Sequence, residues 1–145
     1  MEPKIPISDV QLLDLEWDNG RLVLLRDDDH MLRRFGQVEV RLFEDTCVTP
    51  FVLRAVADEI WVPVNGKAVL RLIDRRSDSP DKDRYFQIAL NAAEPQALLI
   101  PFGVAYSVEN EEAATLIRLS THADGKHPDD EIIPFEDLSD LLVEE

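Results

Sequence analysis

The sequence contains almost no cysteine. Its one cysteine, Cys47, cannot form an internal disulfide, which excludes a disulfide-stabilised scaffold and favours a reducing compartment, the cytoplasm. The apolar stretches are about five to seven residues long, well short of the roughly 20 that a membrane helix needs. Residues 1–6 lack the basic start and apolar core of a signal peptide, so we expect no export signal and no membrane partner.

Basic residues are also scarce. The chain has 15 Lys and Arg against 30 Asp and Glu, which gives a net charge of -15. The excess is uneven, because residues 109–145 contain 12 acids and 2 bases. Such a surface repels phosphate backbones, so unspecific nucleic-acid binding is excluded. The first 108 residues hold 13 of the 15 bases, and an anion site among them remains compatible with the charge.

What the sequence does have is apolar alternation with a period of two. Its 145 residues, 45% of them hydrophobic, predict one globular domain spanning residues 1–145. Val38, Val40 and Leu42 alternate with Glu39 and Arg41, which predicts a half-buried strand with the apolar side chains inside. Further strands are expected at Arg21–Leu25, Phe51–Ala57, Ile60–Val64, Lys67–Asp74, Tyr85–Leu90, Ala97–Ile100, Val104–Val108 and Ala114–Ser120.

Turns and one helical segment complete the prediction. Asn19-Gly20 and Asn65-Gly66 favour two-residue hairpins. Residues 75–84 form a polar loop, and the acidic run at 129–131 is interpreted as a solvated loop. Near the C-terminus Phe135, Leu138 and Leu141 fall on one face of a short helix. Many short strands with no helices between them indicate an all-β antiparallel sandwich or small barrel.

Two fragments resemble the cupin superfamily. Residues 101–110 read P-x-G-x-x-Tyr-x-x-x-N, close to the second cupin motif, and Glu59 precedes Gly66 by six intervening residues, as at the end of the first. Proline and glycine turn the chain sharply into a strand and aim the side chain at position 106 into the barrel. The resemblance implies a cupin jelly roll with a short C-terminal helix.

Within the cupins, residues 59–137 resemble the dTDP-4-dehydrorhamnose 3,5-epimerases and the dTDP-sugar ketoisomerases. The matching segments are Asp74–Pro80, close to D-x-R-x-S-S-P, then Ile100–Val108, close to I-P-x-G-x-A-H-x-F. Two closing segments follow, Ser120–His127, close to the T-D-Y-Y segment, and Ile132–Asp137, close to I-x-W-x-D. This likeness implies a nucleotide-sugar ligand, isomerase chemistry if the protein is active, a homodimer, and no metal or other cofactor.

The chain departs from these families at the positions that carry their chemistry. Residues 47–60 contain no histidine and the second-motif position is Tyr106, so the imidazoles of a metal-dependent cupin dioxygenase are missing. The epimerases take their base from R-G-x-H, and the corresponding segment here ends in Ala57. Their closing tyrosines are replaced by Ser120–Ala123. Epimerisation needs a group that titrates near neutral pH beside the carbon acid, and it is absent where the family has it.

The remaining candidates are assigned as follows. Tyr106 and His122 are the predicted proton-handling pair, although a packed strand tyrosine and an exposed loop histidine would fit the same pattern. The predicted substrate-binding residues are Arg54, Arg71, Arg118 and Glu59. Guanidinium groups match phosphate oxygens, but each arginine also fits the solvent face of an alternating strand.

Two functions therefore stay open. The first is a divergent sugar-nucleotide epimerase-like cupin that binds a nucleotide sugar or a related small molecule and has lost the family's catalytic residues. The second is a non-catalytic binding or structural dimeric cupin whose barrel is filled by side chains. The side chains that residues 51–57 and 60–64 direct into the barrel distinguish the two. Large apolar side chains there would leave no polar cavity and would exclude the enzyme.

Overall fold

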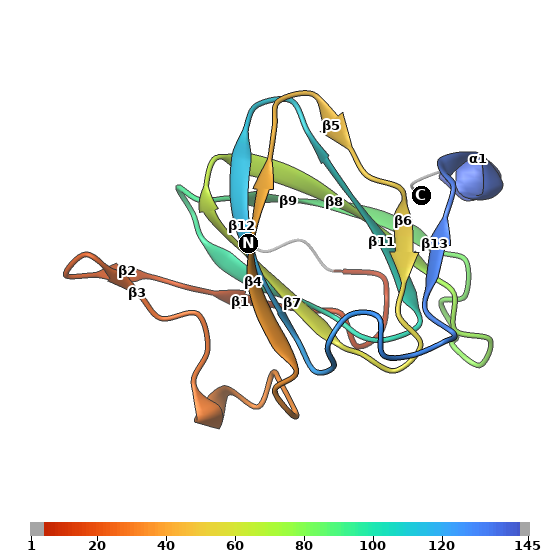
Figure 1. Cartoon of the computed structure of the whole chain (residues 1–145), viewed down its shortest axis with the longest axis horizontal. Helices are drawn as coiled ribbons and strands as arrows, with labels where there is room; N and C mark the ends of the chain where they lie inside the picture. Colours follow the sequence, from red (N-terminus) through yellow and green to blue (C-terminus); the bar gives the residue numbers. More distant parts are fainter. Residues whose placement is uncertain (1–4, 143–145) are drawn as a thin grey trace.

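Thirteen strands and three short helical turns make up the described part of the chain, residues 5–142 of a computed structural model (Figure 1). The strands are β1 Gln11–Asp14, β2 Trp17–Asp18, β3 Arg21–Leu22, β4 Gln37–Phe43, β5 Cys47–Val48, β6 Phe51–Leu53, β7 Glu59–Asn65, β8 Lys67–Asp74, β9 Tyr85–Asn91, β10 Gln96–Ile100, β11 Val104–Asn110, β12 Ala114–Ser120 and β13 Glu131–Ile133. The helical turns are η1 Asp27–Asp29, α1 Phe135–Leu138 and η2 Ser139–Leu141. None of the described helices is long and apolar enough to cross a membrane.

Two antiparallel sheets form the body of the molecule. One has the strand order β1-β10-β7-β12-β4, and the other has β13-β6-β11-β8-β9 with β5 paired to β11. Neighbours in each sheet are often distant in sequence, as in a jelly roll, and Figure 1 shows the two sheets facing each other. Buried apolar side chains from both sheets pack between them. The predicted all-β sandwich is confirmed.

The two Asn-Gly turns have different roles. Asn19 and Gly20 both have positive φ and join β2 to β3 as the predicted two-residue hairpin, which projects from the body in Figure 1. The hairpin predicted at Asn65-Gly66 is wrong, because β7 belongs to the first sheet and β8 to the second. Gly66 instead turns the chain between the sheets, at φ +75°, with Ala113 O only 2.6 Å from where a Cβ would lie.

Strand β4 has the opposite orientation to the predicted one. Val38, Val40 and Leu42 are 52%, 61% and 77% exposed, while Glu39 and Arg41 face the interior. Period-two alternation defines two faces but does not say which one is buried. The inward polar residues here have partners, since Arg118 donates to Glu39 and the Arg41 guanidinium lies over the rings of Phe43 and Trp61.

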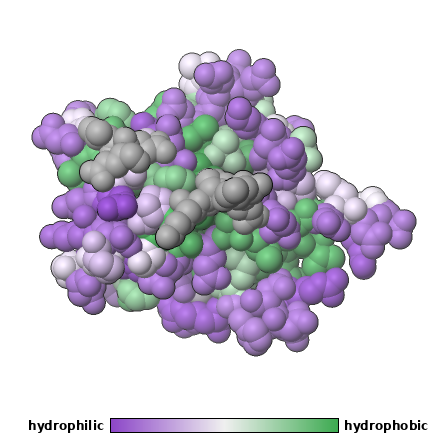
Figure 2. All heavy atoms as spheres, turned by 180° about the vertical axis from the view of Figure 1, so that it is seen from behind, coloured by the Kyte–Doolittle hydropathy of each residue, from purple (hydrophilic) through white to green (hydrophobic). Residues whose placement is uncertain are grey.

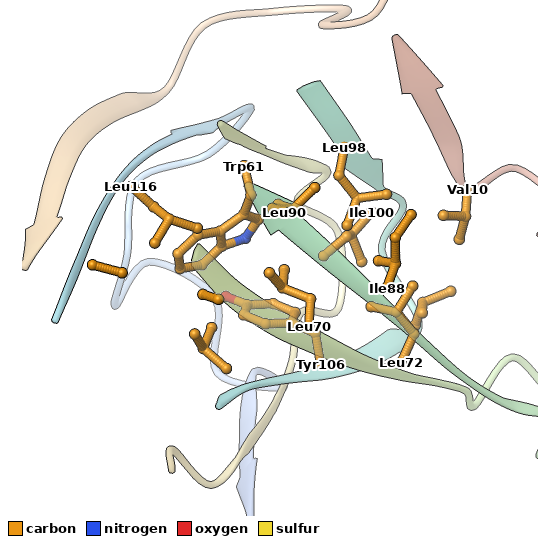
Figure 3. Packing of buried hydrophobic residues seen from close by; sticks show 14 of the residues in the cluster. Val10, Trp61, Leu70, Leu72, Ile88, Leu90, Leu98, Ile100, Tyr106 and Leu116 are labelled. Carbon is orange, nitrogen blue, oxygen red and sulfur yellow. The ribbon is translucent and has the colours of Figure 1, made fainter. Parts of the chain in front are cut away.

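The interior of the sandwich is divided into an apolar part and a polar end. Trp61 packs edge-on against Tyr106, with ring centroids 5.6 Å apart, and both lie among leucine and isoleucine side chains from the two sheets (Figure 3). Trp61 is the large aromatic that β7 directs inward, whereas Ile60 and Val62 belong to a separate cluster on the outer face. The polar end begins at Glu59 and is described below.

The outer faces of both sheets are partly covered. Residues 13–32 pack on the outside of the first sheet, and α1 and η2 pack through Leu138 on the outside of the second. The predicted C-terminal helix is confirmed as one turn of α-helix followed by a 3₁₀ turn. The face seen in Figure 2 is mainly hydrophilic, with hydrophobic patches between the polar groups.

Candidate functional site

Four of the predicted site residues meet at one end of the sandwich. We call Arg54, Glu59, Tyr106 and Arg118 the Glu59 cluster. Glu59 begins β7 and lies opposite Ser120 on β12 and Ile100 on β10. Each side chain is at least nine-tenths buried, so the cluster belongs to the interior rather than to the solvent face that the simpler interpretation of the arginines assumed.

Glu59 is the centre of the cluster. Its side chain is 1% exposed and accepts hydrogen bonds from Arg54 Nη1, from Arg118 Nη1 at 3.2 Å and from Trp61 Nε1 at 3.1 Å. The Tyr106 hydroxyl interacts with Glu59 and Arg118. A buried carboxylate is costly unless it is paired and hydrogen-bonded, and the two guanidinium groups meet that requirement.

A second set of carboxylates surrounds the two arginines from outside. Asp124 accepts a hydrogen bond from Arg54 Nη1 on Oδ1, at 3.0 Å, and another from Arg118 Nη2 on Oδ2. It therefore bridges the two arginines. Asp130 accepts from Arg54 Nε at 3.1 Å and from the Ala55 amide at 2.8 Å. Glu39 accepts from Arg118 Nη2. Both guanidinium groups are therefore occupied by acidic side chains of this chain.

The surroundings shift the pKa values of several of these groups. Burial and the nearby charge of Glu59 raise the pKa of Tyr106 well above its ordinary value, so its hydroxyl keeps its proton. Burial alone would raise the pKa of Asp124, but the hydrogen bond and charge of Arg118 and the charge of Arg54 lower it. Burial opposes the charge of Arg54, yet Glu59, Asp130 and Asp124 together raise the pKa of this arginine.

His122 and Arg71 lie apart from the cluster in different ways. His122 contributes its backbone carbonyl to Arg54 at 3.1 Å, while its ring contacts Thr121 Oγ1 at 2.8 Å and Arg34 Nη1 at 3.3 Å. Burial, and then the charges of Arg34 and Arg33, lower the pKa of the His122 ring.

Arg71 is on the outer face of the second sheet. Its guanidinium lies 5.6 Å from the ring centroid of Phe51 and 5.0 Å from that of Phe135, where α1 covers the sheet. Its Nε is 3.6 Å from Glu109.

Sequence reasoning missed three carboxylates of this site. The solvated loop expected at residues 129–131 is wrong for Asp130, which binds Arg54. Asp124 carried no motif, and Glu39 was expected on the solvent face. The one usable signal was the charge distribution, since residues 109–145 are strongly acidic while residues 1–108 hold 13 of the 15 bases.

The side chains of the Glu59 cluster are almost fully buried in this conformation. A pocket of about 290 Å³ is lined by Lys67, Ala68, Val69 and residues 109–112, and another of about 310 Å³ by residues between Leu13 and Asp29. Neither is lined by a member of the cluster. Among residues 5–142 no group of three or more His, Cys, Asp or Glu is arranged to hold a metal ion.

Solved structures of sugar-nucleotide isomerases and epimerases have the same architecture as this chain. Over 92% of the chain it matches 88% of a dTDP sugar isomerase from Desulfovibrio desulfuricans G20, with a TM-score of 0.80 and 22% identity. It matches the 3'-monoepimerase ChmJ from Streptomyces bikiniensis in complex with dTDP with a TM-score of 0.82 and 18% identity, covering 99% of this chain and 77% of ChmJ. For the dTDP-4-dehydrorhamnose 3,5-epimerase from Elizabethkingia anophelis NUHP1 the TM-score is 0.82, at 16% identity over 98% and 84% of the two chains. At these identities the likeness establishes the fold, the predicted cupin jelly roll.

A closer relative narrows the class. The spore coat polysaccharide biosynthesis protein SpsL from Bacillus subtilis (strain 168) is 32% identical over 117 residues, which cover 79% of this chain and 78% of SpsL. No protein-family model matches the sequence. The chain belongs to the family of SpsL.

Proposed function

We propose that this protein binds a nucleotide sugar at the Glu59 cluster, as a divergent sugar-nucleotide epimerase-like cupin of polysaccharide biosynthesis. The observation that carries the proposal is the buried guanidinium pair, Arg54 and Arg118, beside the Tyr106 hydroxyl. Guanidinium groups suit a diphosphate, and a tyrosine hydroxyl suits a sugar oxygen. The kinship with SpsL and the dTDP complex of ChmJ support the ligand class.

We further propose that the ligand is bound without the family's proton abstraction. Glu59 is the carboxylate next to Tyr106, and hydrogen bonds from two guanidinium groups and an indole occupy its oxygens. A carboxylate held in this way is poorly placed to accept a proton from a carbon acid.

One observation favours a different function, that of an active isomerase. The Tyr106 hydroxyl lies inside the cluster and keeps its proton, because burial and the charge of Glu59 raise its pKa, so it can donate a hydrogen bond to a ligand oxygen there. Deuterium uptake from D₂O into a dTDP-4-keto sugar distinguishes the two. We expect no uptake above the protein-free rate; uptake that is lost in Tyr106→Phe would establish catalysis instead.

Ligand binding itself is tested by thermal unfolding with dTDP-, UDP- and GDP-sugars. A ligand that binds the folded state raises the unfolding midpoint as its concentration rises. We expect that rise to shrink in Arg54→Lys, because lysine cannot reproduce the guanidinium fork, and to persist in Arg21→Lys on the projecting hairpin. Absence of any shift at millimolar concentrations of all three classes would reject the proposal.

A homodimer in the cytoplasm completes the proposal. Strand β4 is an edge of the first sheet and exposes Val38, Val40 and Leu42, so a second copy could pair with it and cover its apolar face. The free, half-buried Cys47 fits a reducing compartment.

A further inference from the structure

We infer that Asp124 occupies the anion site of this protein, so that residues 121–130, here called the strap, must move away before a diphosphate ligand binds to Arg54 and Arg118. The inference rests on the proposed function, because it concerns how the same site admits its ligand. It assigns the strap as a competing internal ligand, a role that neither the fold nor the relatives define.

The geometry of Asp124 is that of a bound anion. Its two oxygens are shared between two guanidinium groups, Oδ1 with Arg54 Nη1 at 3.0 Å and Oδ2 with Arg118 Nη2. Arg118 Nε is buried and has no hydrogen-bond partner among the described residues. A phosphoryl group carries more acceptor oxygens than a carboxylate and could satisfy this remaining donor as well.

The two sides of this contact differ in how firmly they are held. The side chains of Arg54 and Arg118 are 5% exposed and follow or lie within strands, whereas that of Asp124 is 49% exposed in a loop. Gln37 fixes Asp124 from β4, accepting from its amide at 3.0 Å and donating to Oδ2 at 3.2 Å. Asp124 is therefore the member of the contact that can leave.

The charges explain why the strap must open. In the closed form the guanidinium groups of Arg54 and Arg118 face four carboxylates, those of Glu39, Glu59, Asp124 and Asp130. This surplus of negative charge repels an incoming anion. When the strap withdraws Asp124 and Asp130, two positive groups face two negative groups and the repulsion is removed.

The test compares Asp124→Asn with Asp129→Asn, a matched loss of one charge in the same loop at a side chain with no such bridge to the two arginines. Inorganic pyrophosphate and dTDP are titrated by calorimetry into each folded variant. We expect Asp124→Asn to bind pyrophosphate about tenfold more tightly than the wild type, because a competing charge is gone, and Asp129→Asn to match the wild type.

A second measurement does not depend on any variant. Hydrogen exchange of the amides of residues 121–130 in the wild type is expected to speed up when pyrophosphate binds, since the strap leaves its contacts. Unchanged affinity in Asp124→Asn together with unchanged exchange would overturn the inference.

The failure of the strap and the failure of the proposed function give different results. If Asp124→Asn gains pyrophosphate affinity but no nucleotide sugar stabilises the wild type, the strap stands and the proposed ligand class falls. If nucleotide sugars bind the wild type while pyrophosphate affinity and strap exchange stay constant, the ligand class stands and the strap falls.

Discussion

Two buried carboxylates fix the orientation of the arginines around them. Glu59 lies inside the sandwich between Arg54 and Arg118, and Asp74 is fully buried at the end of β8. At both positions hydrophobic residues of the same size would give a similar or higher free energy of unfolding, since a buried ion pair offers little net stability. Their value is geometric, because each fixes arginines in one orientation.

Asp74 organises the loop that follows β8. It accepts hydrogen bonds from the Arg76 amide at 3.0 Å, from the Arg76 guanidinium at 2.9 and 3.0 Å, and from Ser79 Oγ at 2.5 Å. Arg76 in turn reaches Asp9 and the carbonyl of Ser8. The segment that resembles the epimerase loop therefore ties the N-terminal region to the second sheet.

The pH dependence of stability follows from Asp74. Burial would raise its pKa, but the hydrogen bonds from Arg76 and Ser79 lower it below the ordinary value. A carboxyl group whose pKa is lower in the folded state stabilises the fold above its unfolded pKa of about 3.9, and this contribution is lost as the pH falls through the folded value. We expect Asp74→Asn to lower the free energy of unfolding by about 3 kcal/mol at pH 7, and the difference from the wild type to narrow below about pH 4.

Urea unfolding of both proteins from pH 7 to pH 2.5 measures this difference. Asp78→Asn is the control, because Asp78 is exposed in the same loop. Parallel curves for the wild type and Asp74→Asn across the whole range would contradict the assignment.

At the scale of elements, strand boundaries were easier to predict than strand surroundings. The predicted ranges of β8 and β12, Lys67–Asp74 and Ala114–Ser120, agree with the structure at both ends. Their alternation is bounded by turn residues, and that information is local. The short strands β5 and β13 were missed because two or three residues carry no period.

Long-range pairing decided what local patterns could not. The sequence of β4 allowed either face to be buried, and the partners of Glu39 and Arg41 across the interior determined which one is. The same holds for the candidate site. Arg54, Glu59, Tyr106 and Arg118 were predicted individually, but the further carboxylates that occupy the arginines are distant in sequence. Asp130 lies in a loop 76 residues from Arg54, and Glu39 lies on β4, 79 residues from Arg118.

The exposed face of β4 gives a prediction about assembly. If a second copy covers Val38, Val40 and Leu42, a charge placed there is buried unpaired and opposes association. We expect the wild type to have twice the 16.5 kDa mass of one chain by light scattering, and Leu42→Glu to have the mass of one chain. Val48→Glu, at a side chain 54% exposed on β5, is the matched control. A dimeric Leu42→Glu protein would exclude this face as the interface.

At the scale of the whole molecule, the uneven charge has a structural meaning. In the acid-rich region after residue 108, Asp124 and Asp130 form ion pairs with Arg54, and Asp124 also pairs with Arg118 on β12. Part of the acidic excess is thus neutralised inside the fold. Other acids of this region remain on the surface, among them Glu111 and Glu112 in the exposed turn between β11 and β12.

Surface repulsion leads to a prediction about salt. The chain has 30 acids and only 15 bases, so we expect repulsion among its acidic side chains to outweigh the surface ion pairs. Raising NaCl from 10 to 150 mM shortens the screening length from about 30 to about 8 Å. We expect the unfolding midpoint to rise, by roughly 2–4 °C for each kcal/mol of repulsion removed.

The double variant Glu111→Lys/Glu112→Lys isolates this effect. It changes the net charge from -15 to -11, because each substitution replaces one negative charge by one positive charge in an exposed turn. Its midpoint in 10 mM NaCl should exceed that of the wild type, and its salt-induced rise should be smaller, since less repulsion remains to be screened. Calorimetry at one protein concentration measures both quantities. A midpoint that falls with salt would mean that the ion pairs around Arg54 and Arg118, and not repulsion among the surface acids, dominate the electrostatic stability of the molecule.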